Sequence, residues 1–478
     1  MKCIAIIGGG ISGLSAAFAL EQARLSGAEL KYTLFESGPR LGGVILSEQI
    51  NGCLVEAGPD SFLTEKPWAA DLCRQIGLAD QLIGSNDAKR KTYILVNGRL
   101  VPIPDGLMFM VPTNLTATLL SPLFSRSAKL RMARERFFPP QPREVDESVA
   151  SFVERHYGKE LVDRLADPLL AGVYGGEASL LSVRAVLPRF AEMEDKYGSL
   201  GKGVLAARKQ AGPQKNPRPL FTTLKNGMQQ MADALAQTLP ATNLHPNTPV
   251  QLLQRQDHGW LVSAGYKTDH FDAAILATTA PQAANLLQIA SPELAHELNS
   301  IPYSSSITVT LGYGRDVRSA LPPGFGFLVP HSGGKRLLAA TFVHNKFPHR
   351  APDDRALIRC FLGGTRDEQI FSSTDDEIVT LARAELRQIL GISAEPDFVR
   401  VHRWKNAMAQ YNVGHLDRLT RIENLLSQVS GVSLAGNGYR GIGVPDCVRS
   451  GQDAAQKALA AVGIAGIEPV TSVNVPHV

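Results

Sequence analysis

The chain has 478 residues, of which 44% are hydrophobic and 20% are charged, and its formal net charge is +4. This length exceeds what one ordinary hydrophobic core holds, so two or three domains are expected. The small net charge, with no basic run interleaved with aromatic residues, argues against nucleic acid as a partner. The five scattered cysteines form no CxxC pair, which favours a reducing compartment and no metal site.

The first predicted element is a short buried strand at residues 3–7, and a glycine motif follows it directly. Residues 8–13 spell G-x-G-x-x-G, and apolar residues then recur at helical spacing. The glycines permit a tight turn, close approach of a pyrophosphate and close helix–strand packing, while the helix N-terminus attracts the anion. A second strand, 32–35, ends in Glu36, where a carboxylate usually accepts ribose hydroxyls. This order of elements predicts a dinucleotide site.

The residues after Glu36 indicate which dinucleotide is bound. They continue the pattern Glu36-x-x-x-Arg40-x-Gly42-Gly43, which resembles the second fingerprint of the large FAD-dependent, amine-oxidase-like flavoproteins. Arg40 can neutralise pyrophosphate charge, and the two glycines leave room for the cofactor. The pattern therefore favours FAD over NAD.

Residues 105–142 mix apolar residues with a high density of arginine. Two interpretations stay open: an amphipathic segment that lies on an anionic membrane, or helices that pack on their own domain with a solvated basic face. Because residues 147–170 also have a helical pattern, roughly 90–205 is expected to be mainly helical. No apolar run reaches the roughly 18 residues of a spanning helix. The expected location is therefore cytoplasmic, with at most peripheral contact at the inner face of the membrane.

Short strands dominate the pattern after the Gly- and Pro-rich stretch 210–219, which predicts a loop. Three strands are predicted at 249–253, 260–264 and 271–277. They match the same flavoprotein superfamily, in which the first of them meets the adenine through its backbone, here at about Val250. Three further strands, predicted at 306–312, 325–329 and 336–342, would form the floor of a substrate pocket.

The stretch LAGNGYRGIGVPDCVRSGQ, residues 434–452, contains five glycines between a predicted strand at 432–435 and a helical pattern at 453–462. Such glycines, among them Gly436, let backbone approach the ribityl chain and pyrophosphate of a long cofactor. Pro445 suits the first turn of a helix, whose positive end would face the N1–C2=O edge of a flavin. The stretch is therefore expected to be the second half of the FAD site.

Four segments distinguish among the members of this superfamily: GPDSF (58–62), AGVYGG (171–176), RWKNAMAQYNVGH (403–415) and GIGVPDC (441–447). Together they resemble the protoporphyrinogen and coproporphyrinogen oxidases of haem synthesis, and the similarity runs to about Val462. The resemblance implies an oxygen-dependent enzyme with noncovalent FAD. It would remove six electrons from a porphyrinogen to give the porphyrin, with H2O2 as the other product. The choice between coproporphyrinogen III and protoporphyrinogen IX, and the oligomeric state, stay open.

The implied fold is α/β, with a discontinuous Rossmann-like FAD-binding domain, an α+β substrate domain and a mainly α-helical insertion. The FAD-binding domain is expected at 1–88, 206–285 and 401–466. The helical insertion is expected at 89–205, the substrate-binding sheet at 286–400 and a tail at 467–478.

The motifs and the family's contacts with FAD fall on Gly8, Gly9, Gly10, Ile11, Ser12, Gly13, Glu36, Ser37, Arg40, Gly43, Gly58, Pro59, Asp60, Ser61, Val250, Trp404, Gly436, Val444, Pro445 and Asp446. By the same resemblance Phe62, Val173 and Phe327 line the substrate pocket, with Lys66 near a propionate. The two phenylalanines could equally be core residues. No catalytic side chain is expected, since flavin N5 takes the hydride.

Two positions depart from the family pattern. Asn437 stands where the superfamily often has an acid, and Thr92 stands where animal and plant members carry an arginine for a propionate. The basic run Lys89-Arg90-Lys91 next to Thr92 is the alternative contact for that propionate. The alternatives for the whole chain are an amine oxidase or a carotenoid-type desaturase on the same fold, or a non-catalytic protein that binds FAD or NAD.

Overall fold

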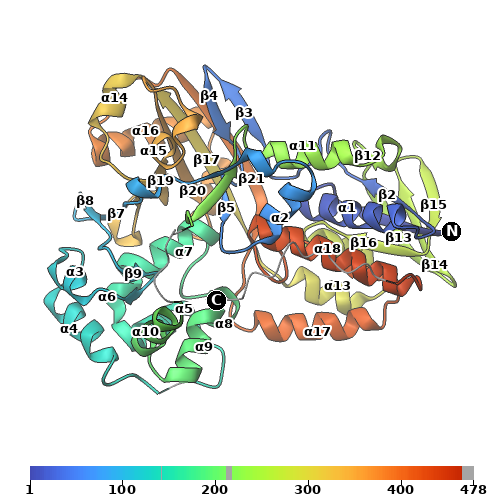
Figure 1. The fold of residues 1–478 in the computed structure, drawn as a ribbon, viewed down its shortest axis with the longest axis horizontal. Coiled ribbons are helices and arrows are strands. Elements are labelled where there is room, and N and C mark those ends of the chain that lie inside the picture. Colours follow the sequence, from blue (N-terminus) through green and yellow to red (C-terminus); the bar gives the residue numbers. More distant parts are fainter. Residues whose placement is uncertain (142, 212–217, 466–478) are drawn as a thin grey trace.

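The computed structural model describes residues 1–141, 143–211 and 218–465. Figure 1 shows three regions: a layered α/β region around α1 and α18, a second sheet with α14–α16 beside it, and a group of helices from α3 to α10. The described helices include none that is both long and apolar enough to cross a membrane. The division into domains stays a prediction.

The first region contains a five-stranded parallel sheet in the order β12-β2-β1-β16-β22. Its strands are β1 (Lys2–Ile7), β2 (Leu30–Phe35), β12 (Leu244–His245), β16 (Ala273–Leu276) and β22 (Val432–Leu434). Along β1, Ile4 and Ile6 pack toward one hydrophobic cluster, and Ala5 and Ile7 toward another. The central strand is buried on both faces, as its continuous apolar run predicts.

Helices cover one face of this sheet, and a second sheet with further helices covers the other. The first face is covered by α1 (Ile11–Leu25), α11 (Gln229–Thr238) and α18 (Val444–Ala461). The other is covered by the meander β13 (Val250–Gln256), β14 (Gly259–Ala264) and β15 (Lys267–Phe271), with α12 (Ala280–Leu287), α13 (Pro292–Asn299) and α17 (His415–Ser427). The α/β layers expected from the glycine motif are confirmed.

One predicted strand, 271–277, is wrong, because the third strand of the meander is β15 (Lys267–Phe271) and Ala273–Leu276 form β16 of the parallel sheet, with Asp272 between them. The Asp272 carboxylate accepts hydrogen bonds from the backbone N–H of Cys3, at 2.8 Å, and from Lys2 Nζ, at 3.1 Å. The chain therefore leaves the meander at Phe271 and enters the parallel sheet at Ala273.

The second region is a seven-stranded sheet in the order β21-β17-β20-β19-β18-β7-β8. Its strands are β7 (Thr92–Val96), β8 (Arg99–Pro102), β17 (Tyr303–Tyr313), β18 (Gly326–Leu328), β19 (Ala339–Phe342), β20 (Ala356–Gly363) and β21 (Phe398–Ala409). Three helices accompany it: α14 (Arg315–Ala320), α15 (Val343–Lys346) and α16 (Asp375–Leu390). The three strands predicted between 306 and 342 are confirmed, although the last begins later than expected.

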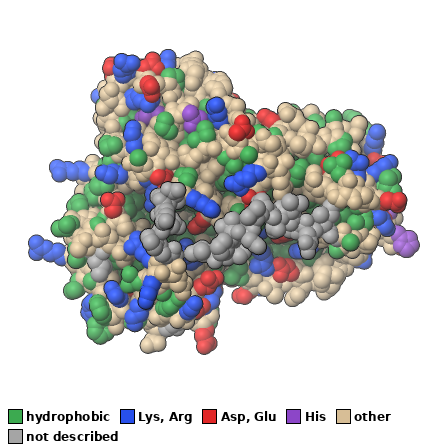
Figure 2. All heavy atoms as spheres, in the orientation of Figure 1, with side chains coloured by type: hydrophobic (Ala, Val, Ile, Leu, Met, Phe, Trp, Pro, Cys, Tyr) green, Lys and Arg blue, Asp and Glu red, His purple; other side chains and the backbone are tan. Residues whose placement is uncertain are grey.

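The third region consists of short helices. These are α3 (Leu115–Leu120), α4 (Arg126–Glu135), α5 (Val149–Tyr157), α6 (Lys159–Leu161), a π-helical turn (Val162–Ala166), α7 (Asp167–Tyr174), α8 (Val183–Val186), α9 (Pro188–Tyr197) and α10 (Leu200–Ala211). The helical pattern of 147–170 is confirmed, with an interruption at Gly158, whose φ is +92°. Hydrophobic and basic side chains gather on the exposed face over α3 and α4 (Figure 2). The loop predicted at 210–219 lies mostly outside the described residues.

Smaller elements connect the regions. They are the hairpin β3 (Ser47–Ile50) and β4 (Cys53–Glu56), the three-stranded sheet of β5 (Phe62–Leu63), β11 (Phe221–Leu224) and β6 (Leu82–Gly84), the pair β9 (Leu107–Met108) and β10 (Val111–Pro112), and α2 (Trp68–Gln75).

Candidate functional site

A cavity of about 1440 Å³ lies where the three regions meet. It extends from the Gly8–Ser12 turn and the start of β13 to β18 and β19 of the seven-stranded sheet and to α7 and α8 of the helical region. Ligand pockets for one small molecule usually measure about 300–1,000 Å³. The volume therefore suits a cofactor and a substrate together.

The glycine motif builds one end of this cavity. A Cβ on Gly13 would overlap the carbonyl oxygen of Gly8, whereas a Cβ on Gly10 would meet only Gly43 Cα, at 4.0 Å. Gly13 is therefore required by helix–strand packing, and Gly10 leaves open space on the cavity side. No side chain caps the N-terminus of α1. Its unpaired N–H groups and positive dipole end fit a pyrophosphate.

Glu36 follows β2 and lines the cavity next to this motif. Its Oε2 accepts a hydrogen bond from the backbone N–H of Gly9, and its Oε1 accepts one from that of Gly38, each at 2.7 Å. These bonds fix the carboxylate beside the glycine turn. The predicted contact with a ribose stays a prediction.

Arg40 has a different environment from the one expected. Its guanidinium donates hydrogen bonds to the carbonyls of Ile45, at 2.7 Å, and of Leu41 and Gly43. Arg40 does not line the cavity, whereas Gly42 and Gly43 do. Burial lowers the pKa of Arg40. The arginine thus holds the loop that closes over the glycine turn, and its contact with pyrophosphate stays a prediction.

Most of the other predicted cofactor residues also line the cavity. Of the full set, only Gly9, Gly13 and Arg40 are not on its wall. Val250, at the start of β13, lies at the end where the adenine is expected, next to Thr248. The backbone N–H of Thr248 donates to the carbonyl of Glu36 at 2.8 Å. This bond holds the start of β13 next to Glu36.

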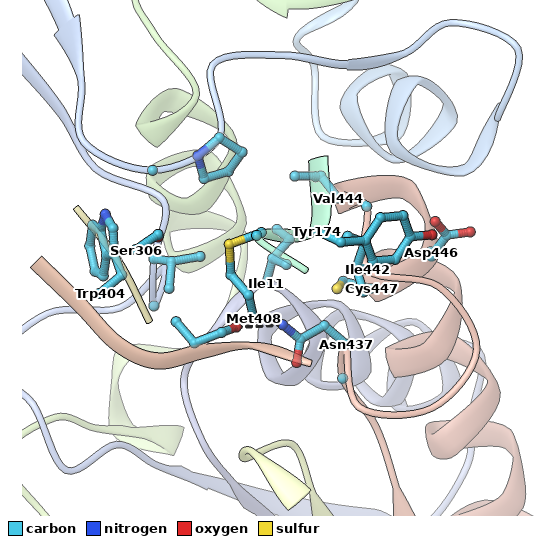
Figure 3. Close-up of a pocket in the computed structure, with 18 of the residues that line it drawn as sticks. Ile11, Tyr174, Ser306, Trp404, Met408, Asn437, Ile442, Val444, Asp446 and Cys447 are labelled. Carbon is cyan, nitrogen blue, oxygen red and sulfur yellow. Dashed lines mark hydrogen bonds between the residues drawn. The ribbon is translucent and has the colours of Figure 1, made fainter. Parts of the chain in front are cut away.

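The glycine-rich stretch after β22 forms another part of the cavity wall, and its contact with FAD stays a prediction. Asn437 Nδ2 donates to the carbonyl of Ala407 at 2.8 Å, and Figure 3 shows Asn437 beside Met408 and Ile442. The hydroxyl of Tyr411 donates to the Asn437 carbonyl at 2.7 Å and accepts from the N–H of Gly441 at 2.8 Å. The ring of Tyr411 stacks on His415, with 4.1 Å between centroids. This arrangement fixes the stretch without an acidic side chain at position 437.

The helix that begins at Val444 has no side-chain cap, and Val444, Pro445 and Asp446 line the cavity. The helix begins at Val444, as Pro445 in its first turn predicted, and continues through the helical pattern at 453–462. Asp446 pairs with Lys66, with 2.7 Å between Oδ2 and Nζ. Lys66 also lines the cavity. Its contact with a propionate stays a prediction.

The predicted substrate residues line the cavity from three elements, with Phe327 on β18 of the seven-stranded sheet, Val173 on α7 and Phe62 on β5. Phe327 and Phe62 are almost fully buried and belong to hydrophobic clusters as well, whereas Val173 is 56% exposed. Thr92 lines the cavity, and the basic residues at 89–91 do not. The prediction missed the cavity residues Tyr411, Thr308, Lys346 and Arg359. Only Tyr411 had a signal in the sequence, since it lies within the segment 403–415.

Comparisons with known proteins agree with this geometry. Residues 11–459 match the family model described as flavin containing amine oxidoreductase. The coproporphyrinogen III oxidase of Bacillus subtilis is 33% identical over 464 residues, which cover 96% of this chain and 98% of that protein. Protoporphyrinogen oxidase 2 of Arabidopsis thaliana is 27% identical and covers 95% of this chain and 93% of its own.

A solved structure from Exiguobacterium sp. 255-15, provisionally described as a protoporphyrinogen oxidase, superposes with a TM-score of 0.85 and 30% identity. It covers 95% of this chain and 98% of its own. The chain belongs to the flavin-containing amine oxidoreductases, and within them to the family of the coproporphyrinogen III and protoporphyrinogen oxidases, so its cofactor is a flavin.

Proposed function

We propose that this protein binds FAD noncovalently and oxidises a porphyrinogen, coproporphyrinogen III or protoporphyrinogen IX, to the porphyrin. O2 is the proposed acceptor and H2O2 the other product. The observation that carries the proposal is that one continuous cavity extends from the glycine turn at Gly10 to the wall that contains Phe327. The likeness to enzymes named for these two substrates supports it.

FAD, rather than a shorter flavin, is supported by the length of the cavity. It includes Val250 and Thr248 beyond the Glu36 carboxylate, where an adenosine would lie. Noncovalent binding is supported by Cys447, the cysteine on the cavity wall. Burial raises the pKa of its thiol to about 12, and thiols are poor nucleophiles when protonated.

A bound flavin supplies a two-electron acceptor, so three successive oxidations account for the six electrons and six protons that leave a porphyrinogen. The protein's own residues provide orientation. The chamber on the substrate side is largely apolar, with Leu169, Leu328 and Phe361 among its walls. Such walls exclude water and let a flat, greasy macrocycle lie against the flavin site.

The experiment is to purify the protein, heat it, and identify the released flavin by its spectrum and retention. Each porphyrinogen is then added without oxygen, and a primary amine serves as the control substrate. We expect loss of the flavin absorption with a porphyrinogen only. On admission of air we expect porphyrin fluorescence and H2O2. Flavin reduction by the amine alone would support the amine-oxidase alternative instead.

Contact with an anionic membrane is a second, separate proposal for the helical region. Leu120, Leu130, Phe137 and Phe138 are between 63% and 85% exposed, and they lie on or next to α3 and α4. The guanidinium of Arg134 lies 5.5 Å from the ring of Phe138. Exposed apolar side chains beside arginines suit an interface with anionic lipid.

This proposal is tested by sedimentation with lipid vesicles. We expect the protein to sediment with vesicles that contain phosphatidylglycerol and not with purely zwitterionic vesicles. A protein that stays in solution with both kinds of vesicle would favour a solvated basic face.

A further inference from the structure

Five charged side chains form a cluster behind the backbone segment 57–61, which lines the cavity. The cluster consists of Glu56, Asp60, Lys346, Arg350 and Arg359. All except Asp60 are buried, and the Asp60 side chain is only 16% exposed. With all five groups ionised, three cations and two carboxylates leave this five-charge cluster with one net positive charge; burial raises the pKa of Glu56 and lowers that of Lys346, and their ion-pair partners oppose both shifts.

The carboxylates are each held by a cation of the cluster. Lys346 Nζ lies 3.0 Å from both carboxylate oxygens of Asp60. Arg350 Nη2 donates to Glu56 Oε1 at 2.9 Å. Burial works against the ionised carboxylate of Asp60, but Lys346, Arg350 and Arg359 more than offset it and lower the Asp60 pKa.

The cations also bind the carbonyls of the segment 57–61. The Ala57 carbonyl accepts from Trp404 Nε1 at 2.8 Å, and from Thr308 Oγ1 and Arg359 Nη2 at 3.1 Å. Arg359 Nη2 also donates to the Gly58 carbonyl at 2.5 Å. Figure 3 shows Trp404 on this wall of the cavity.

The end of the segment is held in the same way. The Asp60 carbonyl accepts from Arg350 Nη2 at 2.7 Å and from Thr223 Oγ1 at 2.9 Å. In a trans peptide the C=O and the following N–H point in opposite directions. Because the Ala57 and Asp60 carbonyls point into the cluster, the N–H groups of Gly58 and Ser61 point away from it, to the cavity side. Within the described ranges neither of these two N–H groups has a hydrogen-bond acceptor.

The cluster's net positive charge has no counter-ion within the cluster. Nε of Arg350 and Nε of Arg359 are buried and have no hydrogen-bond partner among the described residues. An uncompensated buried cation costs free energy unless an anion lies near it. Since Arg359 and Lys346 line the cavity, the cavity is where that anion would be.

We propose that the five-charge cluster positions the Gly58 and Ser61 N–H donors toward the bound flavin and places one positive charge behind them, which raises the flavin's reduction potential. A reduced flavin carries negative charge, and oriented donors backed by a cation stabilise it. These are positioning residues, since they hold the segment 57–61 by hydrogen bonds, and Lys346 and Arg359 also reach the cavity wall. The inference rests on the flavin assignment and not on which porphyrinogen is oxidised.

A series of charge variants tests this inference. Lys346→Met lowers the net charge of the cluster to zero, and Asp60→Asn raises it to two. Lys346→Arg and the double variant Lys346→Met/Asp60→Asn both keep it at one. The midpoint potential of each flavin-loaded protein is measured against a redox dye with no porphyrinogen present, so failure of the porphyrinogen proposal would leave this result unaffected.

We expect the potential to follow the net charge: Asp60→Asn above the native protein, the two charge-preserving variants close to it, and Lys346→Met below it. The expected change per charge is at least tenfold in the equilibrium between reduced and oxidised flavin, which is about 30 mV for two electrons. Potentials of Asp60→Asn and Lys346→Met that shift in the same direction, or stay unchanged, would overturn the proposal. If Lys346→Met does not fold, the comparison of Asp60→Asn with Lys346→Arg still decides.

Discussion

Lys66 and Asp446, which are 380 residues apart in the chain, form an ion pair at the first turn of α18. The Asp446 side chain is 5% exposed, and that of Lys66 is 36% exposed. The pair therefore joins a carboxylate that has little access to water with a cation that reaches the cavity. It also ties the segment before α2 to the helix whose N-terminus faces the cavity.

We expect Lys66→Met to destabilise the protein, because Asp446 then stays buried without its cation. The loss in free energy of unfolding should exceed the ~1 kcal/mol of an exposed pair and stay below the 3–5 kcal/mol, roughly, of a fully buried one. Urea unfolding measures it. Lys2→Met, which breaks the more exposed pair of Lys2 with Asp272, is the matched control. Equal effects of the two variants would contradict the prediction.

Gly10→Val should remove bound flavin without unfolding the protein. Gly10 has a φ of −70°, which any residue can adopt, and a Cβ there has open space in the flavin-free cavity. The added side chain would then occupy the place of the pyrophosphate. We expect the flavin dissociation constant to rise at least tenfold, an effect of about 1.4 kcal/mol, with an unchanged unfolding midpoint for the flavin-free protein.

Gly13→Ala is the matched control for this experiment. A Cβ at Gly13 would overlap the Gly8 carbonyl, so that variant should lose stability in the presence and in the absence of flavin. Full flavin occupancy in Gly10→Val would show that the pyrophosphate lies elsewhere.

Much of this architecture could be predicted because its signals are local. The turn at 8–13 depends on glycines at fixed spacing, and the strand 432–435 and Pro445 identify the second half of the site within one short stretch. The structure confirms both elements, with β22 at Val432–Leu434 and α18 from Val444. Such patterns predict backbone geometry because each requires a particular residue type at a particular position.

The five-charge cluster could not be predicted in the same way. Lys346 and Asp60 are 286 residues apart, and Arg359 and Gly58 are 301 apart. No local spacing in the sequence relates these residues. The sequence also does not show which arginines are buried and which are solvated. For Arg40 a local pattern was present, but it did not predict the partners of the side chain. The pattern fits a phosphate ligand, whereas the guanidinium donates to carbonyls of its own loop.

Asn437→Asp should destabilise the glycine-rich stretch, although an acid is common at this position in related flavoproteins. The amide Nδ2 donates to the Ala407 carbonyl, and a carboxylate can only accept, so two oxygens would face each other. We expect a loss of about 1–3 kcal/mol, the cost of leaving a partly buried acceptor unpaired. Chemical denaturation of the flavin-free protein measures it. Asn437→Ala removes the donor without adding a charge, and Asn437→Asp should be the less stable of the two.

His156 links three helices in the helical region through two carboxylates. Its Nε2 lies 2.9 Å from Glu194 Oε1 on α9, and its Nδ1 lies 3.2 Å from Glu135 Oε1 on α4. Arg155, the neighbouring residue, pairs with Glu194 and Glu147. Burial alone would lower the pKa of His156, but the two carboxylates raise it above its usual value. The same contacts lower the pKa of Glu194 to about 2.

These shifts predict the sign of the pH dependence. A raised histidine pKa contributes stability that is complete below the unfolded value of about 6.5 and is lost as the pH rises through the folded value. The lowered pKa of Glu194 contributes stability above about pH 4.5 that is lost as the pH falls toward about 2. The midpoint temperature of thermal unfolding of the native protein should therefore be highest between about pH 4.5 and about pH 6.5. His156→Gln keeps hydrogen bonding but does not titrate. Its loss of stability relative to the native protein should be largest at pH 6 and smallest at pH 9. A stability difference that stays constant across this range would show that His156 stays in one protonation state.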